Sequence, residues 1–231
     1  MREAEAYRAR VEAKARDQGI DLVGIADLTG ERPAVHHLPP DLVAVFDRAV
    51  CLAVRVSPTV LATVRDGPNH LYYHHYRQLN FLLDRAALAV AREIEALGYR
   101  ALAVAASQII DWTHQLGHVS HKDVARLGGL GWRGRNNLLV TPAYGAQVRL
   151  VTVLTDLPLE PASPLGQDCG ACRRCLAVCP AGAIHEQPTA FDHQACFAKL
   201  KEFGKTRGIG QYICGLCVAA CPGRATSGRE F

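Results

Sequence analysis

The spacing of apolar residues predicts alternating helices and strands through the first two thirds of the chain. Helices are predicted where apolar side chains recur every three or four residues, at 4–18 and at 79–97, each followed by a glycine. Short and largely apolar runs predict strands at 20–26, 49–56 and 101–105. The stretch 28–47 holds three prolines and is typical of a loop.

Two further signals follow in the middle of the chain. Ser120 begins a sequence with the form of a capping box, which predicts a short helix at 121–127 that ends in glycines. Residues 137–141 and 147–155 flank a segment with a proline and a glycine, so they predict two strands joined by a short turn. This pattern of helices and strands is that of an α/β fold.

Three prolines between 157 and 168 indicate a linker, and beyond it cysteines replace hydrophobic periodicity as the organising signal. We therefore expect an α/β domain at residues 1–158 and a small second domain, built around metal, at residues 159–231.

Eight of the nine cysteines lie between Cys169 and Cys221. The run Cys169-x2-Cys172-x2-Cys175-x3-Cys179-Pro180 has the spacing by which bacterial ferredoxins hold two [4Fe–4S] clusters. A second run, Cys214-x2-Cys217-x3-Cys221-Pro222, completes both clusters if Cys196 contributes from upstream. We assign cluster one to Cys169, Cys172, Cys175 and Cys221, and cluster two to Cys179, Cys196, Cys214 and Cys217.

Two zinc sites with four thiolates each are the alternative for these cysteines. The ninth cysteine, Cys51, falls inside a predicted strand and is expected to be a buried core residue, with a chemical role as its alternative.

The chain has 231 residues and a formal net charge of +4, which divides as +2 before and +2 after Pro158 (18 − 16 and 8 − 6). Two oxidised clusters with their thiolates would bring the total near zero, so charge gives no reason to expect nucleic-acid binding. No charge-free stretch is long enough for a membrane span, and the first residues lack the apolar core of a secretory signal. We expect a cytoplasmic protein with no membrane association.

Residues 129–134 match the dinucleotide-binding pattern G-x-G-x-x-G. That motif should follow a strand and begin a helix, whereas here a predicted helix precedes it and predicted strands follow. We therefore expect a tight loop that approaches a ligand other than a nicotinamide dinucleotide.

Taken in order, several segments carry a resemblance. They are Gly128-Gly129-Leu130-Gly131-Trp132-Arg133-Gly134-Arg135-Asn136-Asn137-Leu138-Leu139, Pro142-x2-Gly145, Thr155-Asp156-Leu157-Pro158-Leu159, and the double cysteine run. Together they resemble the epoxyqueuosine reductase family and its relatives, the corrinoid reductive dehalogenases. The resemblance implies a nitroreductase-like α/β (α+β) domain that binds cobalamin in its base-off form, followed by a ferredoxin-like domain with two [4Fe–4S] clusters. It also implies a reductase in which electrons pass from the clusters to cobalamin and then to substrate.

The resemblance also implies site residues. Asp111 matches a proposed proton donor, although Trp112-Thr113-His114 replaces the T-G-P that follows this residue in the family. We expect His121 and Lys122 to face the same cavity, to donate a proton or bind an anion. The residues expected to line the cofactor are Ser120, Gly129, Gly131, Trp132, Gly134, Arg135, Asn136 and Asn137.

Alternatives exist for these positions. Asp111 could be a solvated loop carboxylate, and His121 and Lys122 could lie in a solvated helical turn. The aromatic and imidazole group at 72–76 is expected to pack at a helix start, with a tyrosine acid as its alternative.

Family members that act on tRNA continue into a helical-repeat domain, whereas this sequence ends ten residues after Cys221. We therefore expect a small molecule or a modified tRNA base as substrate, and a low-potential ferredoxin or flavodoxin as electron donor. Two other functions remain open. One is a non-catalytic ferredoxin-type electron carrier or corrinoid reductase, and the other is a dehalogenase-like enzyme that acts on a small molecule.

Overall fold

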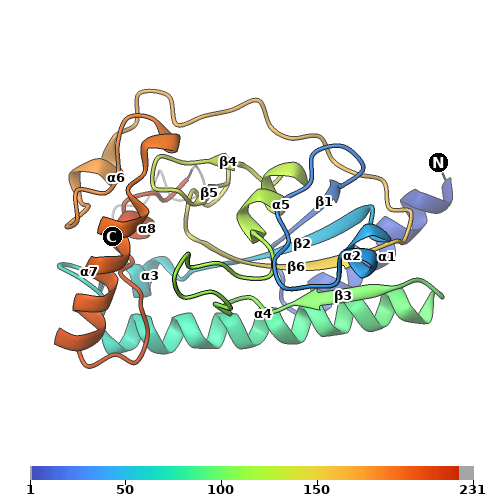
Figure 1. The fold of residues 1–231 in the computed structure, drawn as a ribbon, viewed down its shortest axis with the longest axis horizontal. Helices are drawn as coiled ribbons and strands as arrows, with labels where there is room; N and C mark the ends of the chain where they lie inside the picture. The colour runs from blue at the N-terminus through green and yellow to red at the C-terminus, as the bar shows by residue number, and fades with distance from the viewer. Residues whose placement is uncertain (1, 224–231) are drawn as a thin grey trace. The chain divides into compact units, whose positions relative to one another are not determined.

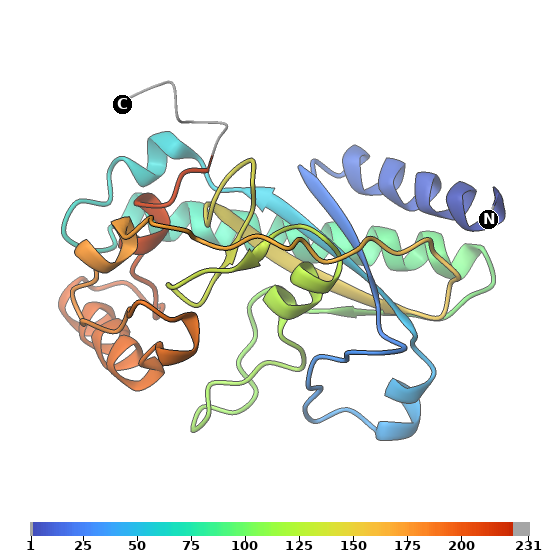
Figure 2. The same cartoon turned by 90° about the horizontal axis from the view of Figure 1, so that it is seen from above.

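The computed structural model describes residues 2–223 and contains a four-stranded sheet with helices on both faces (Figures 1 and 2). In sheet order the strands are β1 (Leu22–Asp27), β2 (Arg48–Arg55), β6 (Val148–Thr155) and β3 (Ala101–Val104). β1 is antiparallel to β2, and β3 is antiparallel to β6. The predicted strands at 20–26, 49–56 and 101–105 are confirmed with small shifts of their ends.

Two helices lie along one face of this sheet, α1 (Arg2–Asp17) and α4 (His70–Ala96) (Figure 2). They are tied together by Glu93, whose carboxylate pairs with Arg10 and lies 3.4 Å from Lys14 Nζ. The apolar residues that predicted these helices form the core, and those fully buried are Val11, Ala15, Leu83, Ala86, Val90 and Ile94. α4 begins nine residues before the predicted start, because Asn69 Oδ1 accepts a hydrogen bond from the Tyr72 amide at 2.8 Å.

The opposite face carries α2 (Pro40–Ala44) and α5 (His121–Leu127) (Figure 2). A β-carbon at Gly24 would lie 2.6 Å from the Gly128 carbonyl oxygen, so glycine here lets the end of α5 pack directly on β1. The bounds of α5 are as predicted, but the capping box is not. Ser120 makes no capping hydrogen bond with its side chain, and the first turn closes through its carbonyl oxygen instead. The loop predicted at 28–47 contains α2, which begins at Pro40, a residue whose fixed φ suits a first helical position.

The predicted pair of strands at 137–141 and 147–155 is wrong as a hairpin. Residues 148–155 form β6 of the main sheet, whereas β5 (Leu139–Val140) pairs with β4 (Trp132–Arg133) in a separate two-stranded ribbon. The cause lies in Gly131, since a β-carbon there would overlap the Val140 carbonyl. Glycine at this position allows the chain to fold back on itself between residues 133 and 139, before the turn that its apolar pattern indicates between 141 and 147.

Beyond the linker, short helices carry or separate the cysteines. They are α6 (Arg174–Ala177), the 3-10 turn η1 (Pro188–Ala190), α7 (His193–Thr206) and α8 (Leu216–Ala219). α6 contains Cys175 and packs against α8, which contains Cys217. α7 begins at a true side-chain cap, with Asp192 Oδ1 accepting from the Ala195 amide at 2.9 Å.

The chain divides into two compact units, each made from several segments. The sheet unit holds residues 2–54, 80–130 and 149–165, and the cysteine unit holds residues 55–79, 131–148 and 166–223. α3 (Pro58–Leu61) and the first turns of α4 belong to the cysteine unit. Within residues 2–223, no helix is both long and apolar enough to cross a membrane.

Candidate functional site

The eight clustered cysteines form two groups in the cysteine unit, and none of them is in a disulfide. The thiol of Cys175 interacts electrostatically with those of Cys169 and Cys172, and the thiol of Cys221 interacts with all three. In the other group, Cys196 interacts with Cys179 and Cys214. Cys217 interacts with these three and also with Cys175. The assignment of these two sets to two clusters, made from sequence spacing, stays a prediction.

Burial, together with the neighbouring thiols of Cys169 and Cys175, raises the pKa of the Cys221 thiol to about 11. Burial and the nearby Cys179 likewise raise the pKa of Cys196 to about 11. Four thiols held together in this way disfavour their own thiolate forms unless a cation is bound between them. Thiolates are the ligands that soft metals prefer. Within residues 2–223, however, no group of three or more cysteine, histidine or acidic side chains is arranged to hold a metal ion directly.

The motif segment Pro142-x2-Gly145 packs on the last of these cysteines. Gly145 has φ +58°, and a β-carbon there would overlap the Cys221 carbonyl. The next residue, Ala146, donates its amide to the same carbonyl at 3.0 Å. This contact explains why a glycine ends the segment, and it attaches the second cysteine run to residues far upstream.

The glycine-rich segment forms the β4–β5 ribbon and its loop. At Gly134 a β-carbon would lie 2.7 Å from Asn136 Oδ1, so the loop is too tight for another residue. Asn137 adopts φ +59° and its Oδ1 accepts from Arg133 Nε at 3.0 Å. The ribbon is not followed by a helix, as a dinucleotide site would require, in agreement with the expectation that this loop serves another purpose.

Buried polar atoms without a partner occur at three of the residues expected to line the cofactor. Trp132 Nε1 and Asn136 Nδ2 in the cysteine unit, and Ser120 Oγ in the sheet unit, are buried and have no hydrogen-bond partner among the described residues. Buried donors of this kind are rare and call for a ligand or a specific explanation. Another polar residue of the set, Arg135, is directed instead at the loop that carries the first cysteines.

Asp111 begins a tight loop in the sheet unit. Its Oδ1 accepts from the amides of Thr113 and His114 at 2.8 and 3.0 Å, and its Oδ2 lies 2.8 Å from His114 Nδ1. These bonds, first the one from the His114 ring, lower the pKa of Asp111 to about 2. In this conformation Asp111 is an ionised loop carboxylate and would have to leave these donors before it could give up a proton.

His121 is held by two structural hydrogen bonds. Nε2 donates to the Ala105 carbonyl at 2.9 Å, and Nδ1 lies 2.9 Å from Thr152 Oγ1. Burial lowers the pKa of His121 to about 4, so the ring is neutral near pH 7. Sequence reasoning missed this buried role because Thr152 and Ala105 are distant in the chain. The neighbouring Lys122 is half-buried and has partners of its own.

The aromatic group at 72–76 lies in the cysteine unit, at the start of α4. Tyr72 is 5% exposed, and its ring lies within 2.8 Å of where a β-carbon on Gly215 would stand, between Cys214 and Cys217. His75 Nε2 accepts from the Ser57 amide at 3.0 Å. The group therefore packs at a helix start, as expected, and it also covers the second cysteine run.

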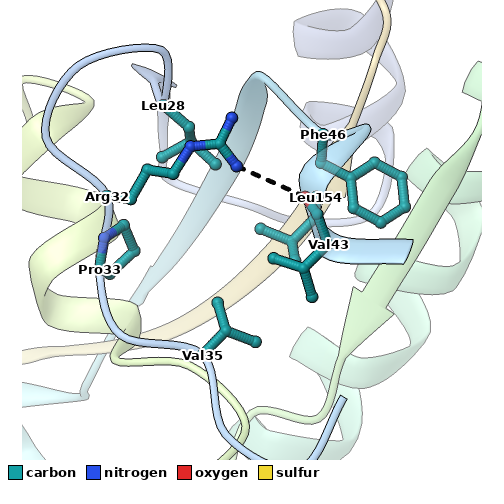
Figure 3. A pocket seen from close by; sticks show the side chains of 7 residues that line it. All are labelled: Leu28, Arg32, Pro33, Val35, Val43, Phe46 and Leu154. Atoms are coloured by element: carbon teal, nitrogen blue, oxygen red, sulfur yellow. Dashed lines mark hydrogen bonds between the residues drawn. The ribbon is translucent and has the colours of Figure 1, made fainter. Parts of the chain in front are cut away.

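An apolar cavity of about 150 Å³ lies in the sheet unit, beneath α2 (Figure 3). Its lining residues are Leu28, Arg32, Pro33, Val35, Val43, Phe46 and Leu154. The one charged side chain, Arg32, donates to the Val43 carbonyl at 3.4 Å (Figure 3). None of the residues predicted for the site lines this cavity.

Comparison with known proteins gives a consistent set of relatives. The chain is 33% identical over 123 residues to an epoxyqueuosine reductase from Bacillus subtilis, and the match covers 50% of this chain and 31% of that protein. It is 35% identical over 158 residues to one from Gloeobacter violaceus, covering 63% of this chain and 46% of the relative. A tetrachloroethene reductive dehalogenase from Sulfurospirillum multivorans is 36% identical over 108 residues, covering 41% of this chain and 21% of the relative. No protein-family model matches.

Solved structures with the same fold come from both groups. A catabolic reductive dehalogenase in complex with 3-bromo-4-hydroxybenzoic acid matches with a TM-score of 0.70 at 20% identity, covering 90% of this chain and 30% of that one. An epoxyqueuosine reductase with an epoxyqueuosine-modified tRNA stem loop matches with a TM-score of 0.65 at 20% identity, covering 99% of this chain and 67% of that one. Another epoxyqueuosine reductase, from Bacillus subtilis, was solved with an aspartate-bearing catalytic loop swung out of its active site. It matches with a TM-score of 0.62 at 20% identity, covering 99% of this chain and 67% of that one.

The chain spans about a third of the Bacillus relative and less than half of the Gloeobacter one. These matches confirm the sequence resemblance to epoxyqueuosine reductases and reductive dehalogenases. The homologues of this chain are named reductases, which makes them oxidoreductases. The chain is similar in sequence to epoxyqueuosine reductases and to a reductive dehalogenase, and it shares the mixed α/β fold of both groups.

Proposed function

We propose that this chain is a cobalamin- and iron–sulfur-dependent reductase, with a cobalamin-binding domain at residues 1–158 and a ferredoxin-like domain with two [4Fe–4S] clusters at residues 159–231. The observation that carries the proposal is the division of eight thiols, seven half-buried and that of Cys172 exposed, into two sets of four. Thiolates in sets of four are the usual ligands of such clusters.

In this proposal the first set, Cys169, Cys172, Cys175 and Cys221, holds cluster one, and the second set, Cys179, Cys196, Cys214 and Cys217, holds cluster two. Tyr72 excludes water from the second set, and Gly145 positions the Cys221 backbone. Electrons would enter from a low-potential ferredoxin or flavodoxin.

The corrinoid part of the proposal rests on the unpartnered buried atoms. Trp132 Nε1 and Asn136 Nδ2 are donors, and a corrinoid carries amide side chains that can accept from them. Gly129, Gly131, Gly134 and Asn137 shape the backbone of the segment. Bound base-off, the corrinoid would supply a cobalt centre for one-electron and two-electron reduction.

Asp111 is the proposed proton donor, with a loop movement as its condition. The loop from Asp111 to Leu116 is closed by its own hydrogen bonds, and these must break for the carboxyl group to take up and deliver a proton. His121 holds Ala105 and Thr152 in place rather than giving up a proton, because its pKa is low and both ring nitrogens are engaged. Lys122, on the first turn of α5, stays the proposed anion-binding residue.

The substrate we propose is a modified tRNA base or a small molecule with a reducible bond. A relative bound to an epoxyqueuosine-modified stem loop supports the first, and one bound to a brominated hydroxybenzoate supports the second. A turnover assay with epoxyqueuosine-bearing stem loop and with a halogenated phenol separates them.

Anaerobic reconstitution with iron, sulfide and cobalamin tests the whole proposal. We expect about eight irons per chain and retained cobalamin with the EPR spectrum of base-off Co(II). The double variant Trp132→Phe, Asn136→Leu removes the two unpartnered donors at similar volume, and should lose cobalamin while it keeps all its iron. Iron well below eight per chain would contradict the iron–sulfur part of the proposal. Cobalamin binding that the double variant leaves unaffected would contradict the corrinoid part.

A non-catalytic electron carrier is the second candidate, and the ionised state of Asp111 favours it. The variant Asp111→Asn distinguishes the two. Full turnover in that variant, under reducing and cobalamin-replete conditions, would remove Asp111 from the mechanism, whereas a carrier would show cobalamin reduction and no substrate turnover at all.

A further inference from the structure

Arg135 crosses from the glycine-rich segment to the loop of the first cysteines. Nη2 donates to the Gly170 carbonyl at 2.9 Å, Nη1 to the Cys172 carbonyl at 3.0 Å, and Nε to the Glu186 carbonyl at 2.7 Å. Its side chain is only 13% exposed. Three acceptors, 35 to 51 residues away in the chain, thus converge on a single guanidinium group.

Two of the three acceptors lie inside the segment Cys169–Cys175. The same segment is held from its own side by Asp168, whose Oδ1 accepts from the Gly170 amide at 2.7 Å, and by a turn from Cys172 N to Cys169 O at 3.0 Å. A carbonyl that is engaged by Arg135 cannot turn inward among the sulfur atoms. The guanidinium therefore fixes which way the peptide groups between Cys169 and Cys175 face.

The charge of Arg135 is only partly neutralised. Glu186 Oε2 lies 3.6 Å from Arg135 Nε, but its Oε1 is bound by Arg173 at 2.6 Å. Two guanidinium groups therefore share one carboxylate, and Arg173, at 60% exposure, is the one screened by water. A partly buried positive charge remains against the first cysteine loop.

We propose that Arg135 is a positioning residue for cluster one rather than a corrinoid ligand, and that its charge favours reduction of that cluster. The inference rests on the proposed function. One electron from a low-potential donor would make the cluster with its thiolates one unit more negative, with no bond made or broken. A fixed positive charge nearby stabilises the reduced form, and a fixed loop preserves the hydrogen bonds to sulfur that also set the potential.

The test is a potentiometric titration of the reconstituted protein, followed by EPR, for four chains. Arg135→Gln removes both the charge and the clamp, by which we mean the three hydrogen bonds from the guanidinium group to backbone carbonyls. Arg135→Lys keeps the charge but cannot make all three hydrogen bonds, and Arg174→Gln is the matched control. Arg174 is an exposed arginine within the same cysteine run, so its removal changes net charge equally in a screened position. Wild type is the reference.

We expect Arg135→Gln to lower the potential of one cluster and leave the other unchanged. The ratio of reduced to oxidised cluster at fixed potential should fall about tenfold, which is about 59 mV for one electron. Arg135→Lys should recover most of that shift but broaden the EPR signal, and Arg174→Gln should match wild type. Selective loss of four irons in both Arg135→Gln and Arg135→Lys, with Arg174→Gln retaining them, would also support the clamp.

Unchanged potentials and EPR signals in Arg135→Gln would overturn the proposal, as would equal shifts in Arg174→Gln or loss of both clusters together. Failure of wild type to bind iron would instead contradict the proposed function. The two failures are therefore distinguishable in the same set of samples.

Discussion

The sheet unit and the cysteine region, residues 166–223, are stabilised in different ways. In the sheet unit, β2 buries six successive residues and α4 buries a full apolar stripe against them. In the cysteine region only five apolar side chains are buried: Ala183, Ile184, Phe203, Ile209 and Ile213. Apolar burial of that extent cannot offset the conformational entropy of ordering so many residues. The first region is therefore organised by packing, and in our proposal the second is organised by the clusters that its thiols would bind.

Removal of metal should have the largest effect on the difference between the sheet unit and the cysteine region. We expect anaerobic chelation of the reconstituted protein to unfold the cysteine region while the sheet unit stays folded, since structural metal sites can contribute on the order of 10 kcal/mol to folding. Hydrogen exchange followed by mass spectrometry measures both regions in one sample. Protection of residues 193–206 that survives chelation would show that packing holds this region after all.

The next largest effect is expected from a substitution that creates a cavity in the core of the sheet unit. Leu83 is fully buried on α4, so Leu83→Ala should lower the free energy of unfolding by about 2–5 kcal/mol in chemical denaturation. Leu88, on the same helix and 50% exposed, gives the control, and Leu88→Ala should cost less than about 0.5 kcal/mol. Iron content of the Leu83 variant should stay near wild type, and a parallel loss of iron would mean that the two regions do not fold separately.

Acid should weaken the sheet unit through His121. Its pKa in the folded chain is about 4, below the ordinary value of 6.5, so the unfolded chain binds more protons between these two values. Stability is therefore full above pH 6.5 and falls as pH drops toward 4, by up to about 3 kcal/mol. Urea denaturation between pH 7 and 5 should show this slope in wild type and in the exposed-site control His74→Gln. The slope should be much reduced in His121→Gln, and an unchanged slope there would assign the acid sensitivity elsewhere.

The smallest effect concerns the helix cap in the cysteine region. Asp192→Ala removes the side-chain acceptor at the start of α7 and should cost about 1 kcal/mol, whereas Asp192→Asn should cost much less. The loss should appear as faster hydrogen exchange at the first turn of α7. If the Asn variant behaves like Ala, the cap does not act through its hydrogen bond.

Sequence reasoning predicted the elements whose apolar residues face a single core. α1 and most of α4 followed from periodicity, because their buried positions repeat at helical spacing. α5 was predicted from a capping box whose side-chain hydrogen bond the structure does not contain. The β4–β5 ribbon was missed, since each strand has two residues and depends on close approach at Gly131. α7 was missed because its sequence, with a single buried side chain, Phe203, carries little apolar pattern.

For the candidate site, cysteine spacing was enough to propose two ligand sets, because ligand spacing is a local property of the chain. The states of Asp111 and His121 could not be predicted, since the loop bonds of the first and the Thr152 contact of the second depend on three-dimensional structure. The same holds for Arg135, which was expected at the corrinoid but contacts a loop 35 to 51 residues away.

Cys51 has a practical consequence for chemical labelling. Its thiol is fully buried in β2 and donates to the His121 carbonyl at 3.7 Å, and burial raises its pKa to about 12. The thiolate attacks alkylating reagents, and metal-free protein is expected to have an unfolded cysteine region, so treatment with iodoacetamide at neutral pH should give eight adducts and stop. A ninth adduct would appear only in molecules whose sheet has opened. Mass spectrometry of intact protein can thus count, molecule by molecule, how often that sheet comes apart.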